Sequence, residues 1–100
     1  MDGYVREKLG AGVSCLIGLG DIKTRLEHAL ISMITIDASN FSDPALGARY
    51  GALYTRATSV NAQIQGEGSI RATLRSLTEE EVGDLAEELL SIHNEMLRAA

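Results

Sequence analysis

The chain has 100 residues, of which 45% are hydrophobic and 23% charged, and its formal net charge is −5 at pH 7. This length suits one hydrophobic core and this composition excludes a disordered tail, so we expect a single domain over residues 1–100. The single cysteine, Cys15, excludes an intramolecular disulfide and favours the reducing cytoplasm.

Residues 3–18 carry apolar side chains at helical spacing, but they include several glycines, each of which weakens a helix by about 1 kcal/mol relative to alanine. We predict a helix here with a break at residues 18–20. The apolar run at 9–19 has about half of the ~20 residues that a membrane-spanning helix needs, so we expect no membrane as a partner.

A second helix should follow Asp21, because aspartate is a favourable N-cap residue. Its apolar residues recur every three or four positions, at Ile22, Leu26, Ala29, Met33 and Ile36, with Leu30 and Ile34 beside them. The helix should end near Asp37, and Pro44 suits the first position of a third helix. There the same rhythm continues through Leu46, Tyr50, Leu53, Ala57, Val60 and Ile64.

Residues 60–75 fit two structures. Apolar and polar residues alternate on both sides of Gly66-Glu67-Gly68, which is the pattern of a β-hairpin. The segment also fits a short helix capped by Ser69, with Ile70 and Leu74 on one face. We favour the helix, because an isolated hairpin is only marginally stable in water, and keep the hairpin as the alternative.

The last helix has the clearest local signals. Thr78 and Glu81 match a capping box, which predicts a helix from Glu79 almost to the C-terminus. Its apolar face holds Val82, Leu85, Leu89, Ile92 and Met96, widened by Ala86, His93 and Leu97. Because three segments share one heptad-like pattern, we predict an all-α bundle of three long amphipathic helices plus a shorter helical segment, with α+β as the alternative.

No residue pattern specifies a metal, a cofactor or a catalytic centre. A di-iron bundle needs glutamate three residues before His28 and His93, and those positions hold Arg25 and Leu90. Cys15 and the histidines show no zinc spacing and no nucleophile motif. The acidic residues of the last helix lack calcium-loop spacing, so a solvated face is the simpler interpretation. We therefore assign no site residues and no cofactor.

Three weaker features concern recognition or helix packing. Tyr54 follows Tyr50 by one turn, between two arginines, and is the tyrosine expected to reach the surface. Gly66 to Ser69 resembles an anion-binding loop but lacks the lysine of a phosphate loop, so we predict a plain turn. Small residues four apart form two strips that would face one another if two helices approach closely; they are Gly10, Ser14 and Gly18, and Gly47 and Gly51.

The charge is unevenly distributed along the chain. Residues 41–77 hold four basic and two acidic groups, whereas residues 78–100 hold one basic and seven acidic groups. The acidic last helix argues against nucleic acid as a partner, because phosphate binding needs clustered Lys and Arg. We expect a small acidic, non-enzymatic protein-protein interaction or regulatory module. A small helical enzyme or ligand-binding protein is the first alternative, and a DNA-associated regulator the second.

Apolar side chains beside the helix stripes predict a homodimer or a larger oligomer of this chain. Ile31 and Ile34 flank the stripe of the second helix, and Leu90 and Leu97 that of the last, so each stripe is wider than one neighbour covers. Monomers rarely expose contiguous apolar patches beyond roughly a few hundred Å², and twofold dimers commonly cover such patches.

Circular dichroism tests the fold class. We expect a helix-dominated spectrum, because three segments carry helical periodicity and only one region is ambiguous. A helical content below about a third, no more than an average globular protein has, would contradict the all-α prediction.

Overall fold

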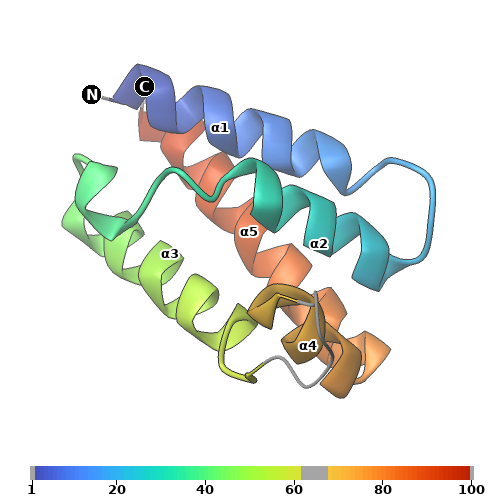
Figure 1. The fold of residues 1–100 in the computed structure, drawn as a ribbon. Helices are drawn as coiled ribbons and strands as arrows, with labels where there is room; N and C mark the ends of the chain where they lie inside the picture. The colour runs from blue at the N-terminus through green and yellow to red at the C-terminus, as the bar shows by residue number, and fades with distance from the viewer. Residues whose placement is uncertain (1, 62–67, 100) are drawn as a thin grey trace.

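The computed structural model describes residues 2–61 and 68–99, and these residues form five α-helices and one 3₁₀ turn, with no strand (Figure 1). The elements are α1 (Asp2–Cys15), α2 (Ile22–Ser32), η1 (Ala38–Asn40), α3 (Pro44–Ala57), α4 (Ser69–Ser76) and α5 (Glu79–Ala99). The all-α prediction is confirmed, with α1 as a further helix of more than ten residues. Helix α4 replaces the second strand of the alternative hairpin, while residues 62–67 lie outside the described part.

Helix α5 is central to the bundle, because it packs against α1, α2 and α3 (Figure 1). Helices α1 and α2 form an antiparallel pair, and α4 crosses one end of the molecule, where it contacts α2 and α3. The stripe predicted for α5 is buried at every position: Val82, Leu85, Leu89, Ile92 and Met96. The period of three and four therefore identified the core side of this helix correctly.

Local capping starts three of the helices where the sequence indicates. Asp21 accepts a hydrogen bond of 2.9 Å from the Thr24 amide, and Asp43 accepts one of 2.9 Å from the amide of Ala45. The capping box of α5 forms in both directions, at 2.9 and 3.1 Å. In α4 the prediction was one residue off, because Gly68 takes the N-cap position and Ser69 is the first helical residue.

The break after α1 lies where we predicted it. Gly20 adopts a φ of 104°, a conformation that favours glycine, and turns the chain into α2. The connection leaves Ile17 and Leu19 almost fully exposed. Ile17 therefore does not extend the apolar face of the first helix, which ends at Cys15.

Two helices end earlier than their apolar rhythm suggests. Helix α2 ends at Ser32, short of the predicted end near Asp37. Turns follow it, in which the amides of Met33 and Ile34 donate to carbonyls three residues back. A run of three β-branched residues at 34–36 disfavours further helix. Ile36 is nevertheless buried, beyond the helix end.

Helix α3 ends at Ala57, although the sequence pattern continues to Val60 and Ile64. The Thr58 hydroxyl donates to the Tyr54 carbonyl at 2.8 Å, which competes with helical pairing. The Val60 amide then donates to the buried Thr73 hydroxyl of α4 at 2.9 Å. Ile64 lies outside the described residues.

The two strips of small residues serve different contacts and do not face one another as predicted. Gly47 and Gly51 of α3 lie against Ala38 of η1, and Gly10 lies against His93 of α5. A Cβ at Gly12 would lie 2.6 Å from the Met33 sulfur, so this glycine gives the buried Met33 side chain its room. The glycines of α3 therefore allow η1 to approach closely, whereas Gly10 of α1 lies beside α5.

Replacing Leu89 by Ala should lower the free energy of unfolding by roughly 2 to 5 kcal/mol, because this fully buried side chain leaves a cavity in the core. The matched control is Leu90→Ala on the exposed side of the same helix, with an expected change within about 0.5 kcal/mol. Urea denaturation measures both, and equal losses would contradict this orientation of α5.

Two glycine substitutions in helices should change stability in opposite directions. A Cβ at Gly47 would lie 2.5 Å from the Ala38 carbonyl oxygen, so Gly47→Ala should destabilise the fold by roughly 1 to 3 kcal/mol. A Cβ at Gly83 meets nothing within 4 Å, so Gly83→Ala should stabilise α5 by up to about 1 kcal/mol. Thermal denaturation followed by circular dichroism compares them, and a stabilising Gly47→Ala would be inconsistent with this packing.

Candidate functional site

The last turn of α2 and the turn that follows it carry two large apolar side chains in solvent. Ile31, near the end of α2, is 49% exposed, and Ile34, just beyond the helix, is 62% exposed. The opposite side of the same helix is completely buried, at Leu26, Ala29 and Leu30. The exposed pair is therefore surplus to the core of this chain, as the width of the sequence stripe indicated.

A pocket lies on each side of Ile34. The first has a volume of about 410 Å³ and lies between α2 and the start of α4; its lining is Glu27, Ile31, Ile34, Gly68, Ser69, Ile70 and Arg71. The second has a volume of about 390 Å³ and lies between the end of α2, η1 and α3; its lining is Ile34, Ile36, Asp37, Ala38, Tyr50, Gly51, Tyr54 and Thr55. Ile34 thus forms a ridge between two hollows.

Tyr50 and Tyr54 line the second pocket and connect α3 to the end of α2. The Tyr50 hydroxyl donates to the Met33 carbonyl at 3.2 Å, and the Tyr54 hydroxyl donates to the Leu30 carbonyl at 2.6 Å. Burial raises the pKa of both hydroxyls above the usual value for tyrosine, so both remain protonated donors to a higher pH than an exposed tyrosine does. As expected, Tyr50 belongs to the core, whereas Tyr54 is only half-buried.

An ion pair between Glu27 and Arg71 borders the first pocket. The Arg71 Nε and Nη2 atoms both lie 2.9 Å from Oε2 of Glu27. The Glu27 side chain is only 14% exposed, whereas that of Arg71 is 63% exposed. This ion pair therefore borders the isoleucine pair on the side of the first pocket, and we call Glu27, Ile31, Ile34 and Arg71 together the α2 patch.

A third pocket, of about 400 Å³, adjoins this ion pair on the side of the α2 N-terminus. Its lining includes the charged or polar side chains of Lys23, His28 and Arg75 together with Glu27 and Arg71. The Lys23 ammonium group donates to the Arg75 carbonyl at 3.4 Å. This pocket therefore extends the charged border of the α2 patch.

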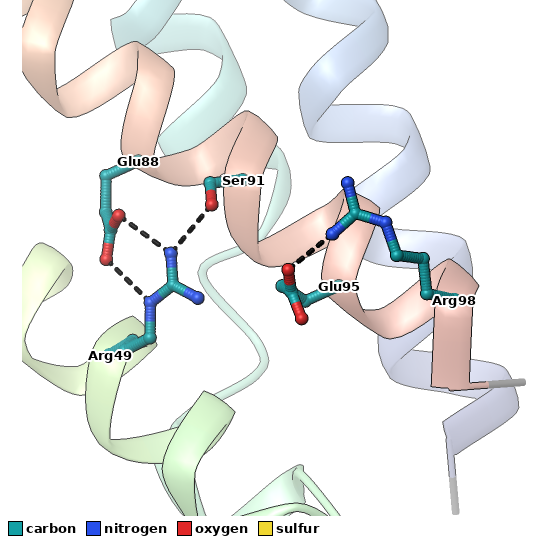
Figure 2. A network of polar contacts seen from close by, with 5 residues as sticks. All are labelled: Arg49, Glu88, Ser91, Glu95 and Arg98. Atoms are coloured by element: carbon teal, nitrogen blue, oxygen red, sulfur yellow. Dashed lines mark hydrogen bonds and ion pairs between the residues drawn. The ribbon is translucent and has the colours of Figure 1, made fainter.

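The two arginines near the tyrosines bind α5, as Figure 2 shows for Arg49. Arg49 makes a bidentate contact of 3.0 and 2.9 Å with Glu88 of α5 and donates to the Ser91 hydroxyl at 2.9 Å. The hydrogen bonds from Arg49 lower the pKa of Glu88. Arg56 lies 3.7 Å from Glu81 of α5. Both arginines thus connect α3 to α5, and neither joins Tyr54 in a recognition surface.

The residues considered for metal binding or catalysis do not form a metal site. His28 is exposed beside the third pocket, His93 is half-buried near Gly10, and Cys15 is half-buried in the last turn of α1. In the part of the chain that the structure describes, no three His, Cys, Asp or Glu side chains are placed to hold a metal ion. Gly68 and Ser69 begin α4, and Gly66 lies outside the described ranges.

Comparisons with models of known protein families, with characterised proteins and with solved structures find no match. None of the helices within 2–61 and 68–99 is both long enough and apolar enough to cross a membrane. The geometry of the α2 patch and its pockets is therefore the basis for assigning a function.

Removing the Tyr50 hydroxyl should change how stability depends on pH. Because the folded state raises the pKa of Tyr50, the unfolded chain loses this proton first, and the wild type should lose stability as the pH rises above about 10. In this pH range, Tyr50 alone should lower the free energy of unfolding by up to about 1.4 kcal/mol per pH unit. In Tyr50→Phe that loss is absent, although one hydrogen bond worth roughly 0.5 to 1.5 kcal/mol is gone at neutral pH.

Urea denaturation of both proteins from about pH 8 to about pH 11 measures the difference. The stability of the wild type should fall more steeply, so that the gap between the two proteins narrows with pH. Parallel curves would show that the Tyr50 hydroxyl is not desolvated in the folded state.

Proposed function

We propose that this protein is a non-enzymatic protein-protein interaction module that acts in the cytoplasm and forms a homodimer through apolar helix surface. One observation carries the proposal. Four large side chains beside the core stripes, Ile31, Ile34, Leu90 and Leu97, are 42% to 62% exposed, although the core beneath them is complete. Such surface is normally covered by a partner, because water around exposed apolar groups is unfavourable.

The chemistry of the pockets supports interaction over catalysis. The Tyr50 and Tyr54 hydroxyls are occupied by carbonyls of α2, and the Glu27 carboxylate is occupied by Arg71. A catalytic acid or base needs access to a substrate proton, and these contacts within the chain already occupy the polar groups. The DNA-associated alternative is weakened in the same way, because Arg49, Arg56 and Arg71 each pair with a glutamate of the same chain.

A small-molecule binding protein is the second candidate. The pocket beside Tyr50 and Tyr54 has a volume of about 390 Å³, within the range of roughly 300 to 1,000 Å³ typical of ligand sites. It ranks second because the exposed apolar surface extends past this pocket, over Ile34 to Ile31. A surface of this extent suits a protein better than a small molecule.

Light scattering after size-exclusion chromatography tests self-association. At micromolar concentration we expect about twice the monomer mass of 10.7 kDa. A quadruple variant, Ile31→Ser, Ile34→Ser, Leu90→Ser and Leu97→Ser, should be monomeric, because it removes the four exposed apolar side chains proposed to form the interface. The control Ala48→Ser/Ala52→Ser changes two exposed positions of α3 and should remain dimeric.

Circular dichroism confirms that each variant is folded before its mass is compared. A wild-type mass near 10.7 kDa throughout that range would refute the homodimer. A quadruple variant that is folded and still dimeric would refute the role of the apolar side chains.

A further inference from the structure

Apolar side chains and one carboxylate line the pocket of about 390 Å³ between the end of α2, η1 and α3. Ile34 and Ile36 contribute to it from the chain after α2, and Tyr50 and Tyr54 from α3. The carboxylate belongs to Asp37, the N-cap residue of η1. Among the described residues of this lining there is no lysine, arginine or histidine, whereas arginine lines both other pockets. The pocket therefore combines apolar surface with a single formal charge, which is negative.

The charge of Asp37 has no basic partner in the part of the chain that the structure describes. The carboxylate accepts hydrogen bonds from the Ser39 hydroxyl and, at 2.8 Å, from the Ser39 amide. Both donors are neutral, so they favour the ionised form and lower the pKa of Asp37 without cancelling its charge. Both bonds end on Oδ1, which leaves Oδ2 as the oxygen that can accept from a ligand. Asp37 differs in this from Glu27, whose carboxylate is paired with Arg71.

The tyrosine hydroxyls of the pocket are already used within the chain. Those of Tyr50 and Tyr54 donate to the carbonyls of Met33 and Leu30. A ligand therefore meets the tyrosines chiefly as apolar rings, next to the side chain of Ile34, which is 62% exposed. Such a surface favours an apolar group, because the contact removes both from water.

The negative charge acts on the inside of the pocket as well as on its rim. Burial is the main cause of the raised pKa of Tyr50, and the charges of Tyr54 and Asp37 add to it. The field of the Asp37 carboxylate therefore reaches a side chain that is only 1% exposed. The same field favours a positive charge in this place, because partly excluded water screens the attraction less than bulk water does.

We infer that this pocket binds a small organic cation. Its ammonium group lies at Oδ2 of Asp37, and its apolar group lies against Ile34 and the two tyrosine rings. The volume of about 390 Å³ suits such a ligand, since small-molecule sites begin at roughly 300 Å³. This inference gives a ligand class to the pocket of the second candidate function, and it does not depend on the proposed homodimer.

Three small compounds test the two parts of the site in the full chain. At neutral pH benzylammonium carries both a positive charge and an apolar ring, benzyl alcohol carries only the ring, and methylammonium carries only the charge. Titrations followed by NMR of the backbone amides give the dissociation constants, and shifts at Ala38, Gly51 and Thr55 locate the site. Benzylammonium should bind at least about threefold more tightly than either other compound, since each of these lacks one contact.

Asp37→Asn removes the charge and keeps an oxygen that can cap η1, because asparagine is also a favourable capping residue. In this variant benzylammonium should lose its advantage over benzyl alcohol. The matched control, Asp43→Asn, makes the same change at the N-cap of α3, outside the pocket, and should bind benzylammonium like the wild type. Circular dichroism confirms that both variants are folded, and the comparison of the three compounds on the wild type needs neither variant.

The outcomes separate this inference from the proposed function. A wild type that binds the two ring compounds equally, or binds neither, overturns the cation site, whatever its mass in light scattering. Equal losses of affinity in Asp37→Asn and Asp43→Asn would also overturn it, because the net charge of the protein and not the pocket would then attract the cation. A monomeric wild type that prefers benzylammonium removes the homodimer and leaves the ligand site standing.

Discussion

The contact between two tyrosine hydroxyls of α3 and the carbonyls at the end of α2 determines much of this structure. Tyr50 and Tyr54 are one turn apart, and their acceptors, Met33 and Leu30, are also one turn apart. The pair therefore fixes both the position and the rotation of the last turn of α2. Because that turn is fixed, Ile34 remains on the outside, and the two pockets beside it lie open.

The arginines divide the charged contacts between two parts of the bundle. Arg49 and Arg56 connect α3 to the acidic helix α5, as Figure 2 shows for Arg49, whereas Arg71 connects α4 to Glu27 of α2. The basic middle segment and the acidic last segment of the sequence thus partly neutralise each other within one chain. Exposed ion pairs of this kind add little stability, so their main effect is to set which charges each surface presents.

Helix starts could be predicted from the sequence, because capping is local; Asp21, Asp43 and Thr78 all act within three residues. Helix ends were predicted less well, because distant groups act on them together with the local residues: the tyrosines of α3 bind the end of α2, and Thr73 of α4 binds the chain after α3. The surplus of Ile31 and Ile34 was visible in the width of the stripe. The ion pair beside them could not be predicted, because Glu27 and Arg71 are 44 residues apart in the sequence.

Met33 lies where three helices meet. Its sulfur occupies the space above Gly12 of α1, and its carbonyl accepts the Tyr50 hydroxyl of α3. Oxidation to the sulfoxide would add an oxygen atom for which this close-packed, fully buried position has no room. Peroxide should therefore oxidise Met33 slowly while the bundle is closed, so that the oxidation rate of this methionine reports how often the packing around it opens.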